Sequence, residues 1–417
     1  MSQRTTLHVY LGKHEQALGR LVFAKDGARE FSQFAYSDDW LADPLRFDVS
    51  PDLGLQSGYQ LRKAPTPHDS CFFGALADTE PDAWGRRVIA RAHAKKRAHN
   101  PNLAPLSAVD YLAAVDDLSR VGALRLRNET GEFVRTTPKG ERSTPTLLEL
   151  GKVLQASRAV ELSQETTEDL AYLQGKGTSL GGMRPKCTLL DTDGALALGK
   201  FPSVGDERAV TRGEVLALHV AQRAGVHSAD ARIVLVNQQP VAVIRRFDRT
   251  ADQSRLPYMS GATLLQASRQ DELSYTQLVD AMRSVCADFA SDARQLWRRL
   301  VLNHLITNVD DHLQNIGFLY TGRKQWRLAP AFDLNPFPDK SPESKTWLSE
   351  DTGPITSIHQ LLSQAAFFEL TPPQAQAVVA EVKHAVQNWK TMAASPDVGM
   401  QAAEMKAFEA AFKEAFV

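Results

Sequence analysis

The residues with the clearest chemical potential lie between Asn308 and Asn315, in the run Asn-Val-Asp-Asp-His-Leu-Gln-Asn. Phosphoryl transfer to a hydroxyl needs one carboxylate that orients the hydroxyl and takes its proton. It also needs an amide oxygen and a second carboxylate that hold Mg²⁺ on the phosphates. Asp310 and Asn315 are five positions apart, the spacing that this chemistry uses, and Asp333 follows an apolar segment. We predict that Asp310 is the base, because Asp311 has the wrong spacing from Asn315. The alternative for the whole motif is a structural one, an acidic turn with a capping Asn. Asn315 and Asp333 are the predicted metal ligands.

A glycine-rich segment precedes these residues in the chain. Four glycines fall between Gly175 and Gly182, and an apolar run follows at Thr188. Backbone N–H groups in such a loop can approach phosphate oxygens closely, and nearby cationic side chains add positive charge. A plain surface loop is the alternative, since glycine-rich turns are common. The candidate phosphate-binding residues of this segment are Ser179, Gly181, Gly182 and Lys186.

A lysine and a glutamate further along fit the same chemistry. The turn Asp191–Gly194 predicts a hairpin whose second strand ends at Lys200. Protein kinases keep the lysine that pairs the nucleotide phosphates at such a strand end, although a lysine extending from a strand end into water is the alternative. Glu214 begins an amphipathic pattern that ends near Gly225, and it is placed to meet Lys200. A solvated glutamate at a helix start is the other reading of Glu214.

Together these motifs resemble the HipA family of serine/threonine-protein kinases, the toxin half of a bacterial toxin–antitoxin pair. The resemblance runs from near residue 4 to at least residue 340, and it includes an N-terminal signature from Phe72 to Arg87. The other matching segments are Ser179–Lys186, Lys200, Ile244–Arg249, Asn308–Asn315 and Leu328–Leu334.

The resemblance implies an α+β, protein-kinase-like bilobal fold that uses ATP and Mg²⁺. It places the adenine at a hinge near Arg245 and Phe247, for which a strand edge with an Asp248–Arg249 salt bridge is the plainer reading. His312 would contact the nucleotide, or be a core histidine bonded to the backbone. The family also has a serine at the position of Ser179 that the kinase itself phosphorylates.

The resemblance further implies partners and an outcome for the cell. It predicts phosphorylation of a translation component, with an aminoacyl-tRNA synthetase as the best single guess, and growth arrest as the result. It predicts a HipB-like helix-turn-helix antitoxin, through which any contact with operator DNA would be indirect. Two alternatives are a catalytically weak co-repressor of the antitoxin and a small-molecule phosphotransferase. The joint retention of Lys200, Asp310, Asn315 and Asp333 argues against the first, and the N-terminal signature argues against the second.

Composition excludes several other classes of protein. The 417 residues are 43% hydrophobic and 23% charged, which is ordinary for a globular chain. A net charge of −1 provides no general attraction to nucleic acid or membrane. The three cysteines lie far apart and form no C-x-x-C pair, which argues against disulfides or zinc. The first residues lack an apolar run, so we expect a cytoplasmic protein without membrane contact.

The coarse pattern predicts three parts. Residues 1–130 are expected to form a HipA-type N-terminal subdomain, β-rich with helices and opening with a hairpin over residues 7–23. Residues 131–248 are expected to form the kinase N-lobe, and residues 249–417 an all-helical C-lobe. Thr144 is the expected N-cap of a largely helical stretch over residues 145–173. The other expected elements are helices over 82–100, 107–117, 278–289, 292–307 and 372–389, and strands over 231–236 and 241–244.

Overall fold

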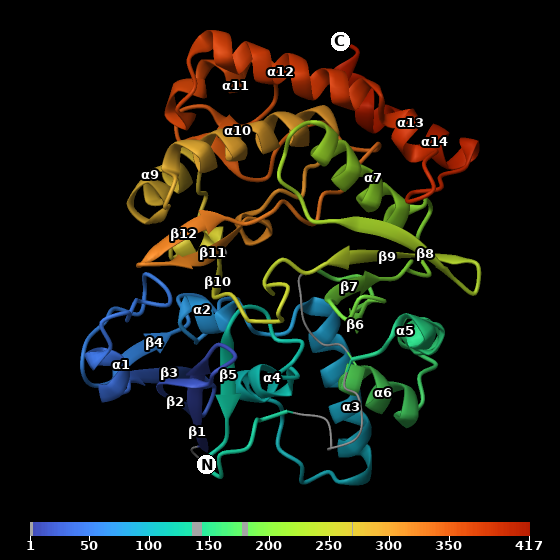
Figure 1. The fold of residues 1–417 in the computed structure, drawn as a ribbon. Coiled ribbons are helices and arrows are strands. Elements are labelled where there is room, and N and C mark those ends of the chain that lie inside the picture. Colours follow the sequence, from blue (N-terminus) through green and yellow to red (C-terminus); the bar gives the residue numbers. More distant parts are fainter. Residues whose placement is uncertain (1–2, 136–143, 177–181, 269) are drawn as a thin grey trace. The chain divides into compact units, whose positions relative to one another are not determined.

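The computed structural model describes residues 3–135, 144–176, 182–268 and 270–417 (Figure 1). Helices and antiparallel strands are mixed along the chain, so the fold class is α+β, as expected. The chain divides into two compact units. Unit 1 comprises Met1–Val204 and Asp248–Met259, and unit 2 comprises Gly205–Phe247 and Ser260–Val417. The boundaries expected after residues 130 and 248 separate kinase lobes, which are not the same as these compact units. These boundaries stay a prediction.

Unit 1 begins with a five-stranded antiparallel sheet. Its hydrogen-bonded order is β4-β3-β2-β1-β5, and the hairpin expected over residues 7–23 is confirmed as β1 and β2. Alternate residues of β3 are buried, which is the period of a sheet with one covered face. Phe23 and Phe34 on this face are fully buried beside Phe72 and Phe73. The strands are β1 (Gln3–Leu11), β2 (Gln16–Asp26), β3 (Arg29–Tyr36), β4 (Gln60–Lys63) and β5 (Leu124–Arg127).

The helices of unit 1 begin where side chains can cap them. Asp82 caps α3, its carboxylate accepting a hydrogen bond from the N–H of Gly85 at 2.7 Å, and Ser107 caps α4. Both helices were expected at these positions. The helices are α1 (Asp38–Ala42), α2 (Gly74–Ala77), α3 (Ala83–His99), α4 (Ala108–Ala114), η1 (Leu147–Glu149), α5 (Leu150–Glu161) and α6 (Thr167–Lys176).

The expected cap at Thr144 is wrong. Thr144 is buried, and the helical stretch begins instead at Thr146, which forms a capping box with Glu149. A capping box needs Glu or Gln three positions after the Thr, because that side chain bonds back to the N–H of the cap. Thr144 has Leu147 at that position, so it cannot close such a box. The stretch is also broken into η1, α5 and α6.

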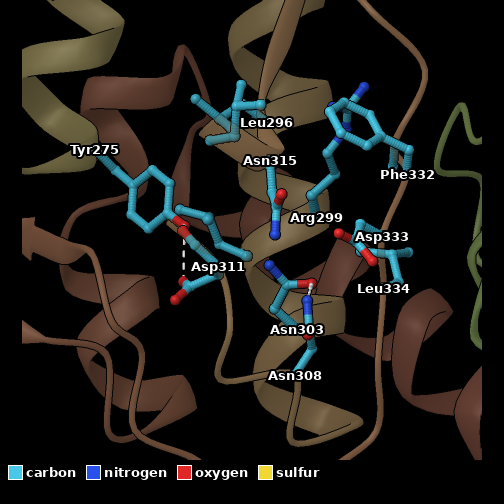
Figure 2. A pocket seen from close by; sticks show the side chains of 13 residues that line it. Tyr275, Leu296, Arg299, Asn303, Asn308, Asp311, Asn315, Phe332, Asp333 and Leu334 are labelled. Carbon is cyan, nitrogen blue, oxygen red and sulfur yellow. Dashed lines mark hydrogen bonds between the residues drawn. The ribbon is translucent and has the colours of Figure 1, made fainter. Parts of the chain in front are cut away.

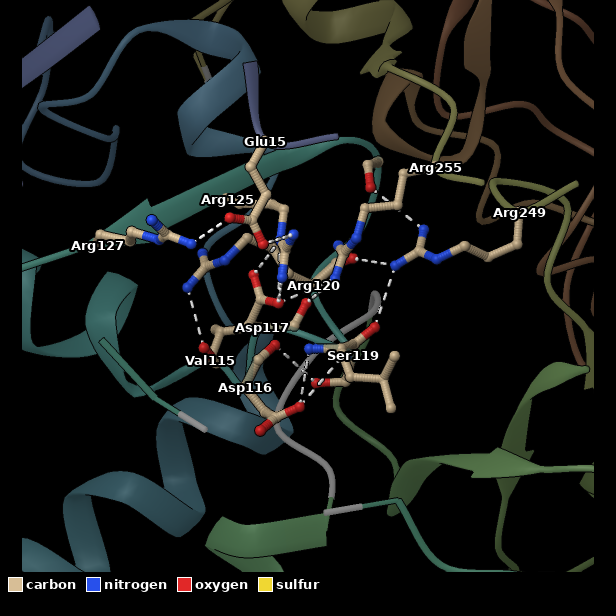
Figure 3. Close-up of polar contacts among 12 residues, drawn as sticks. Glu15, Val115, Asp116, Asp117, Ser119, Arg120, Arg125, Arg127, Arg249 and Arg255 are labelled. Carbon is tan, nitrogen blue, oxygen red and sulfur yellow. Dashed lines mark hydrogen bonds and ion pairs between the residues drawn. The ribbon is translucent and has the colours of Figure 1, made fainter. Parts of the chain in front are cut away.

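Unit 1 also contains a hairpin and the stretch Asp248–Met259, here called the returning segment because the chain comes back to unit 1 there. The predicted hairpin is confirmed as β6 (Lys186–Leu190) and β7 (Leu196–Lys200), with Lys186 directly opposite Lys200. The returning segment is tied to unit 1 by a network of arginines and carboxylates (Figure 3). Asp248 forms the expected salt bridge with Arg249 at 2.7 Å and accepts a hydrogen bond from the N–H of Gly122 at 2.8 Å.

The arginine network is centred on buried groups. Arg120 is fully buried, and burial lowers its pKa to about 10. Its guanidinium donates to the backbone carbonyls of Leu112 and Val115, each at 3.0 Å. Asp117 accepts from both Arg125 and Arg255, at 2.6 and 3.3 Å. Charge-assisted hydrogen bonds therefore help to fix the returning segment within unit 1.

Unit 2 is mostly helical. Its central helix α10 buries Trp297, Leu300 and Val301 and packs against α9, α11 and α12. Helix α7 ends at Arg223 and is followed by Gly225, whose φ of +72° is the left-handed conformation found just after many helices. The expected strands and helices over residues 231–244, 278–307 and 372–389 are confirmed within a few residues at each end. Within the described residues, no helix has the length and apolar character needed to cross a bilayer.

Short strands accompany these helices, so residues 249–417 are not all-helical as expected. Chain reversals at residues 323–324 and 350–352 pair these strands as antiparallel hairpins, β11 with β12 and β13 with β14. The elements of unit 2 are α7 (Val210–Arg223), β8 (Ala231–Val236), β9 (Gln239–Arg245), α8 (Gly261–Leu264), α9 (Tyr275–Val285), α10 (Phe289–Leu305), η2 (Leu313–Asn315), β11 (Gly317–Gly322), β12 (Gln325–Leu328), β13 (Trp347–Ser349), β14 (Gly353–Pro354), α11 (Ile358–Ser363), η3 (Ala365–Phe368), α12 (Pro372–Gln387), α13 (Trp389–Ala393), α14 (Ala402–Phe408) and η4 (Glu409–Ala415). Strand β10 (Tyr258–Ser260) lies where the chain passes from unit 1 to unit 2.

Candidate active site

The two predicted metal ligands line a small cavity of about 30 Å³ in unit 2 (Figure 2). Asn315 and Asp333 both line it, together with the buried end of the loop that follows α10. A cavity of this size holds one or two water molecules or a single ion. Its other lining residues are Tyr275, Leu296, Arg299, Leu300, Asn303, Asn308, Asp311, Ile316, Ala331, Phe332 and Leu334.

Hydrogen bonds fix the two predicted metal ligands. The side-chain N–H of Asn315 donates to the backbone carbonyl of Asp310 at 2.9 Å, so its amide oxygen is not used in that bond. Asp333 has φ +55°, a left-handed conformation that Asp and Asn adopt more readily than most residues. Its carboxylate accepts a hydrogen bond from the side chain of Asn335 at 3.1 Å. Asn315 and Asp333 therefore offer an amide oxygen and a carboxylate to the same cavity, and both are hard ligands that suit Mg²⁺.

The donor set is small, as this chemistry allows. Among the residues that the structure describes, no group of three or more His, Cys, Asp or Glu side chains could hold a metal. A kinase-type site does not need one, because phosphate oxygens and water complete the octahedron around Mg²⁺. Asn315 and Asp333 therefore fit a magnesium ion that arrives with a nucleotide.

Asp310 and Asp311 are neighbours in very different surroundings. The side chain of Asp310 is 45% exposed, and its carboxylate lies 2.9 Å from the ammonium of Lys345. Asp311 is buried, and this burial raises the pKa of its carboxyl. Its two oxygens accept hydrogen bonds from the hydroxyl of Tyr275 and the N–H of Lys345, both at 2.7 Å. Of these two carboxylates only that of Asp310 is exposed, and its role as the base stays a prediction.

His312 lies beside Asp310. Its Nε2 is 3.9 Å from the carboxylate of Asp310, and its side chain is 35% exposed. Its Nδ1 is enclosed and has no hydrogen-bond partner within the described parts of the chain. A nucleotide contact for His312 stays a prediction.

The predicted hinge residues lie at the end of strand β9, where Arg245 is its last residue, and just after it. The backbone N–H of Arg245 donates to the carbonyl of Asp230 at 2.8 Å, while its side chain is exposed. The ring of Phe247 lies 5.4 Å from the ring of Phe332, which lines the cavity and precedes Asp333. The structure thus brings Phe247 close to the predicted metal ligand, although adenine binding there stays a prediction.

The phosphate-binding candidates of unit 1 are partly described. Ser179 and Gly181 lie outside the described residues, whereas Gly182, Lys186 and Lys200 lie within them. Lys186 and Lys200 are 2% and 7% exposed. The ammonium of Lys186 forms an ion pair with Asp82 at 2.7 Å. Phosphate contacts from these lysines remain predicted.

The partner predicted for Lys200 lies in the other unit of the chain. Glu214 is a buried residue of α7 in unit 2, whereas Lys200 ends β7 in unit 1. Its burial excludes the reading of Glu214 as a solvated residue at a helix start. The pairing of Glu214 with Lys200 stays a prediction.

Several residues of the site were not anticipated. Asn308 donates to the side chain of Asn303 at 3.0 Å and accepts from the N–H of Asn335 at 3.2 Å, so it joins α10 to the segment after Asp333. The position of Asn308, two residues before Asp310, could have indicated that it belongs to the site. Nothing in the sequence indicated Lys345, because it lies far along the chain from Asp310.

Comparison with known families decides the relationship. The model of the HipA-like C-terminal domain matches residues 178–389, slightly more than half of the chain. The chain belongs to the HipA-like family. The matched stretch contains every residue predicted above to bind nucleotide or metal, but none of the N-terminal signature.

The chain is also similar to solved structures and to a curated protein. HipA of the Shewanella oneidensis toxin–antitoxin system, solved with HipB and operator DNA, matches 98% of this chain and 95% of its own, with a TM-score of 0.65 and 14% identity. This shows a HipA-like, kinase-type fold. A Haemophilus influenzae protein named "Putative kinase" is 24% identical over 188 residues, which span 39% of this chain and 55% of that protein. The Helicobacter pylori kinase CtkA matches 58% of this chain with a TM-score of 0.39 and 17% identity.

Proposed function

We propose that this protein is an ATP- and Mg²⁺-dependent protein serine/threonine kinase that acts as the toxin of a bacterial toxin–antitoxin pair. The observation that carries the proposal is the arrangement in unit 2. There, Asn315 and Asp333 line the same cavity, and the backbone carbonyl of the half-exposed Asp310 accepts a hydrogen bond from the side chain of Asn315. Membership of the HipA-like family supports the same reading.

The chemistry follows from these positions. Asp310 orients the hydroxyl of a Ser or Thr and takes its proton. The hydroxyl oxygen forms a bond to the γ-phosphorus while the bond to the β–γ bridging oxygen breaks, and the electron pair leaves with ADP. Asn315 and Asp333 would hold Mg²⁺, which neutralises charge on the phosphates when bound. Lys200 and the glycine-rich segment of unit 1 are proposed to bind the phosphates.

The experiment that tests this proposal replaces Asp333 with Asn. Asn tolerates the left-handed backbone at this position, so the fold is expected to survive. The variant loses the carboxylate, and we expect transfer of the γ-phosphate from ATP to fall by at least about 100-fold, since catalysis here is mainly charge stabilisation. Near wild-type transfer by a folded Asp333→Asn protein would refute the proposal.

We further propose a helix-turn-helix antitoxin of the HipB type as the partner and a translation component as the substrate, with an aminoacyl-tRNA synthetase as the first candidate. The Shewanella complex, which contains HipA, HipB and operator DNA, supports the partner. Contact with DNA would then pass through the antitoxin, and action on translation would place the protein in the cytoplasm. Co-expression with a HipB-like protein encoded next to it, followed by co-purification, tests the pairing.

We also propose autophosphorylation of Ser179. A phosphate there would add a charge of about −1.5 to −2 to a segment proposed to bind nucleotide phosphates, and this would weaken ATP binding. Mass spectrometry after incubation with Mg²⁺ and ATP is the test, with Asp310→Asn as the inactive control.

A further inference from the structure

Two buried lysines stand side by side in the β6–β7 hairpin. Lys186 and Lys200 are directly opposite each other in the antiparallel register, so their side chains leave the same face of the hairpin. Both are nearly fully buried. Like charges at such a position repel, and removing an ammonium from water is costly unless an anion compensates. This face of the hairpin therefore requires negative charge.

Asp82 supplies part of that charge from the N-terminal signature. One of its carboxylate oxygens accepts from the N–H of Gly85 at 2.7 Å, and the other accepts from the ammonium of Lys186, also at 2.7 Å. Its side chain is 6% exposed. Because it caps α3, whose buried face includes Trp84 and Val88, the carboxylate cannot move without disturbing the start of that helix.

The start of α3 also meets the end of the glycine-rich segment. The N–H of Trp84 donates to the carbonyl of Gly182 at 3.3 Å. A Cβ placed on Gly182 would lie 3.1 Å from the ammonium of Lys186, so that charge stands directly beside the backbone of the segment. Gly182 has φ +99°, which other residues rarely adopt. One helix start thus holds both the lysine and the backbone beside it.

We infer that Asp82 is a positioning residue for the nucleotide phosphates: it holds the ammonium of Lys186 beside the backbone of Gly182, so that this charge is ready for an incoming triphosphate. The inference rests on the proposed kinase function. It gives the N-terminal part of the chain, which lies outside the matched HipA-like domain, a direct role in the phosphate site. A mobile or displaced Lys186 would lose its charge-assisted contact with the nucleotide.

The test measures phosphoryl transfer by the full chain as a function of ATP concentration. Asp82→Asn keeps the helix cap, since Asn caps as well as Asp, but removes the charge. We expect the KM for ATP to rise between about tenfold and 100-fold, the range for one hydrogen bond to a charged group, with a smaller change in kcat. Asp110→Asn is the matched control, because Asp110 also caps the start of a helix in unit 1, where it accepts from Ser107. Its KM should stay at the wild-type value.

A double variant separates positioning from a general loss of stability. In a Lys186→Met background, Asp82→Asn should raise the KM no further, because the group it positions is gone. Asp82→Ser, which also caps a helix, is the second variant if Asp82→Asn folds poorly in a melting curve. An unchanged KM in a folded Asp82 variant, or an equal rise with and without Lys186, would overturn the inference. A wild-type protein that neither binds ATP nor transfers phosphate would instead overturn the proposed function.

Discussion

Replacing Tyr275 with Phe should destabilise unit 2 through the single atom it removes. Tyr275 is 1% exposed, and its hydroxyl donates to the carboxylate of Asp311 at 2.7 Å. The substitution leaves the ring in place but deprives a buried carboxylate of a donor. A hydrogen bond to a charged group is worth about 1.5–3 kcal/mol. For a unit of this size each kcal/mol shifts Tm by about 2–4 °C, so a loss of roughly 3–12 °C is expected near neutral pH.

The loss should depend on pH with a definite sign. Burial raises the pKa of Asp311 above its ordinary value of 3.8, so the stability tied to the protonated form is present below that value. It is lost as the pH rises through the folded-state pKa. The bond from Tyr275 lowers this pKa, so Tyr275→Phe raises it further and extends the loss to higher pH. The difference in Tm should therefore be largest near neutral pH and shrink below the ordinary value.

The assay is thermal unfolding of wild type and variant at several pH values between about 3 and 8. Tyr320→Phe is the control, because the Tyr320 hydroxyl bonds the N–H of Lys324 in an exposed turn. Its change should stay within about 0.5 kcal/mol. A difference in Tm between Tyr275→Phe and wild type that is absent near neutral pH, or the same at every pH, would show that the Tyr275–Asp311 bond does not carry this energy.

Three further outcomes are expected. Lys345→Met removes the ammonium beside Asp310 and should lower kcat by about tenfold or more, since cationic groups near the transferred phosphoryl stabilise its charge. The control is Lys340→Met, on an exposed turn, which should have the wild-type kcat. Equal rates for the two variants would contradict a role for Lys345. Expression of the wild type without antitoxin should slow growth of the host, whereas Asp310→Asn at the same protein level should not. Phosphate should appear on Ser179 in the active protein after incubation with ATP, and its absence there would exclude self-modification at this residue.

Short-range patterns were the predictable part of this molecule. The helix starts near Asp82 and Ser107 and the turn before Ala195 could be predicted because each depends on residues within a few positions. The assignment of Asp310 rather than Asp311 as the base used only a spacing, and it stays a prediction. The expected cap at Thr144 is wrong because Thr146 competes with it: Thr146 has Glu149 three positions later, which is the capping-box pattern, and this pattern is visible in the sequence.

What stayed hidden depends on contacts between distant parts of the chain. Asp82 and Lys186 meet over an ion pair although more than a hundred positions separate them, and no spacing connects the two. The same holds for Lys345, which reaches Asp310 because the buried Asp311 binds its backbone. Charges that meet in this way follow from the tertiary fold, and a single sequence does not specify them.

The returning segment fixed by the arginine network makes the two units inseparable by any single cut. The chain passes from one unit to the other three times, after Val204, Phe247 and Met259. A fragment that starts at Gly205 would carry Arg249 and Arg255 without Asp117 and the backbone carbonyls that accept their hydrogen bonds in the whole chain. Exchange of whole units between relatives would therefore need three splice points, one at each crossing, rather than a simple fusion. Such a topology favours inheritance of the entire chain as one piece, because each unit is built from separate stretches of the sequence.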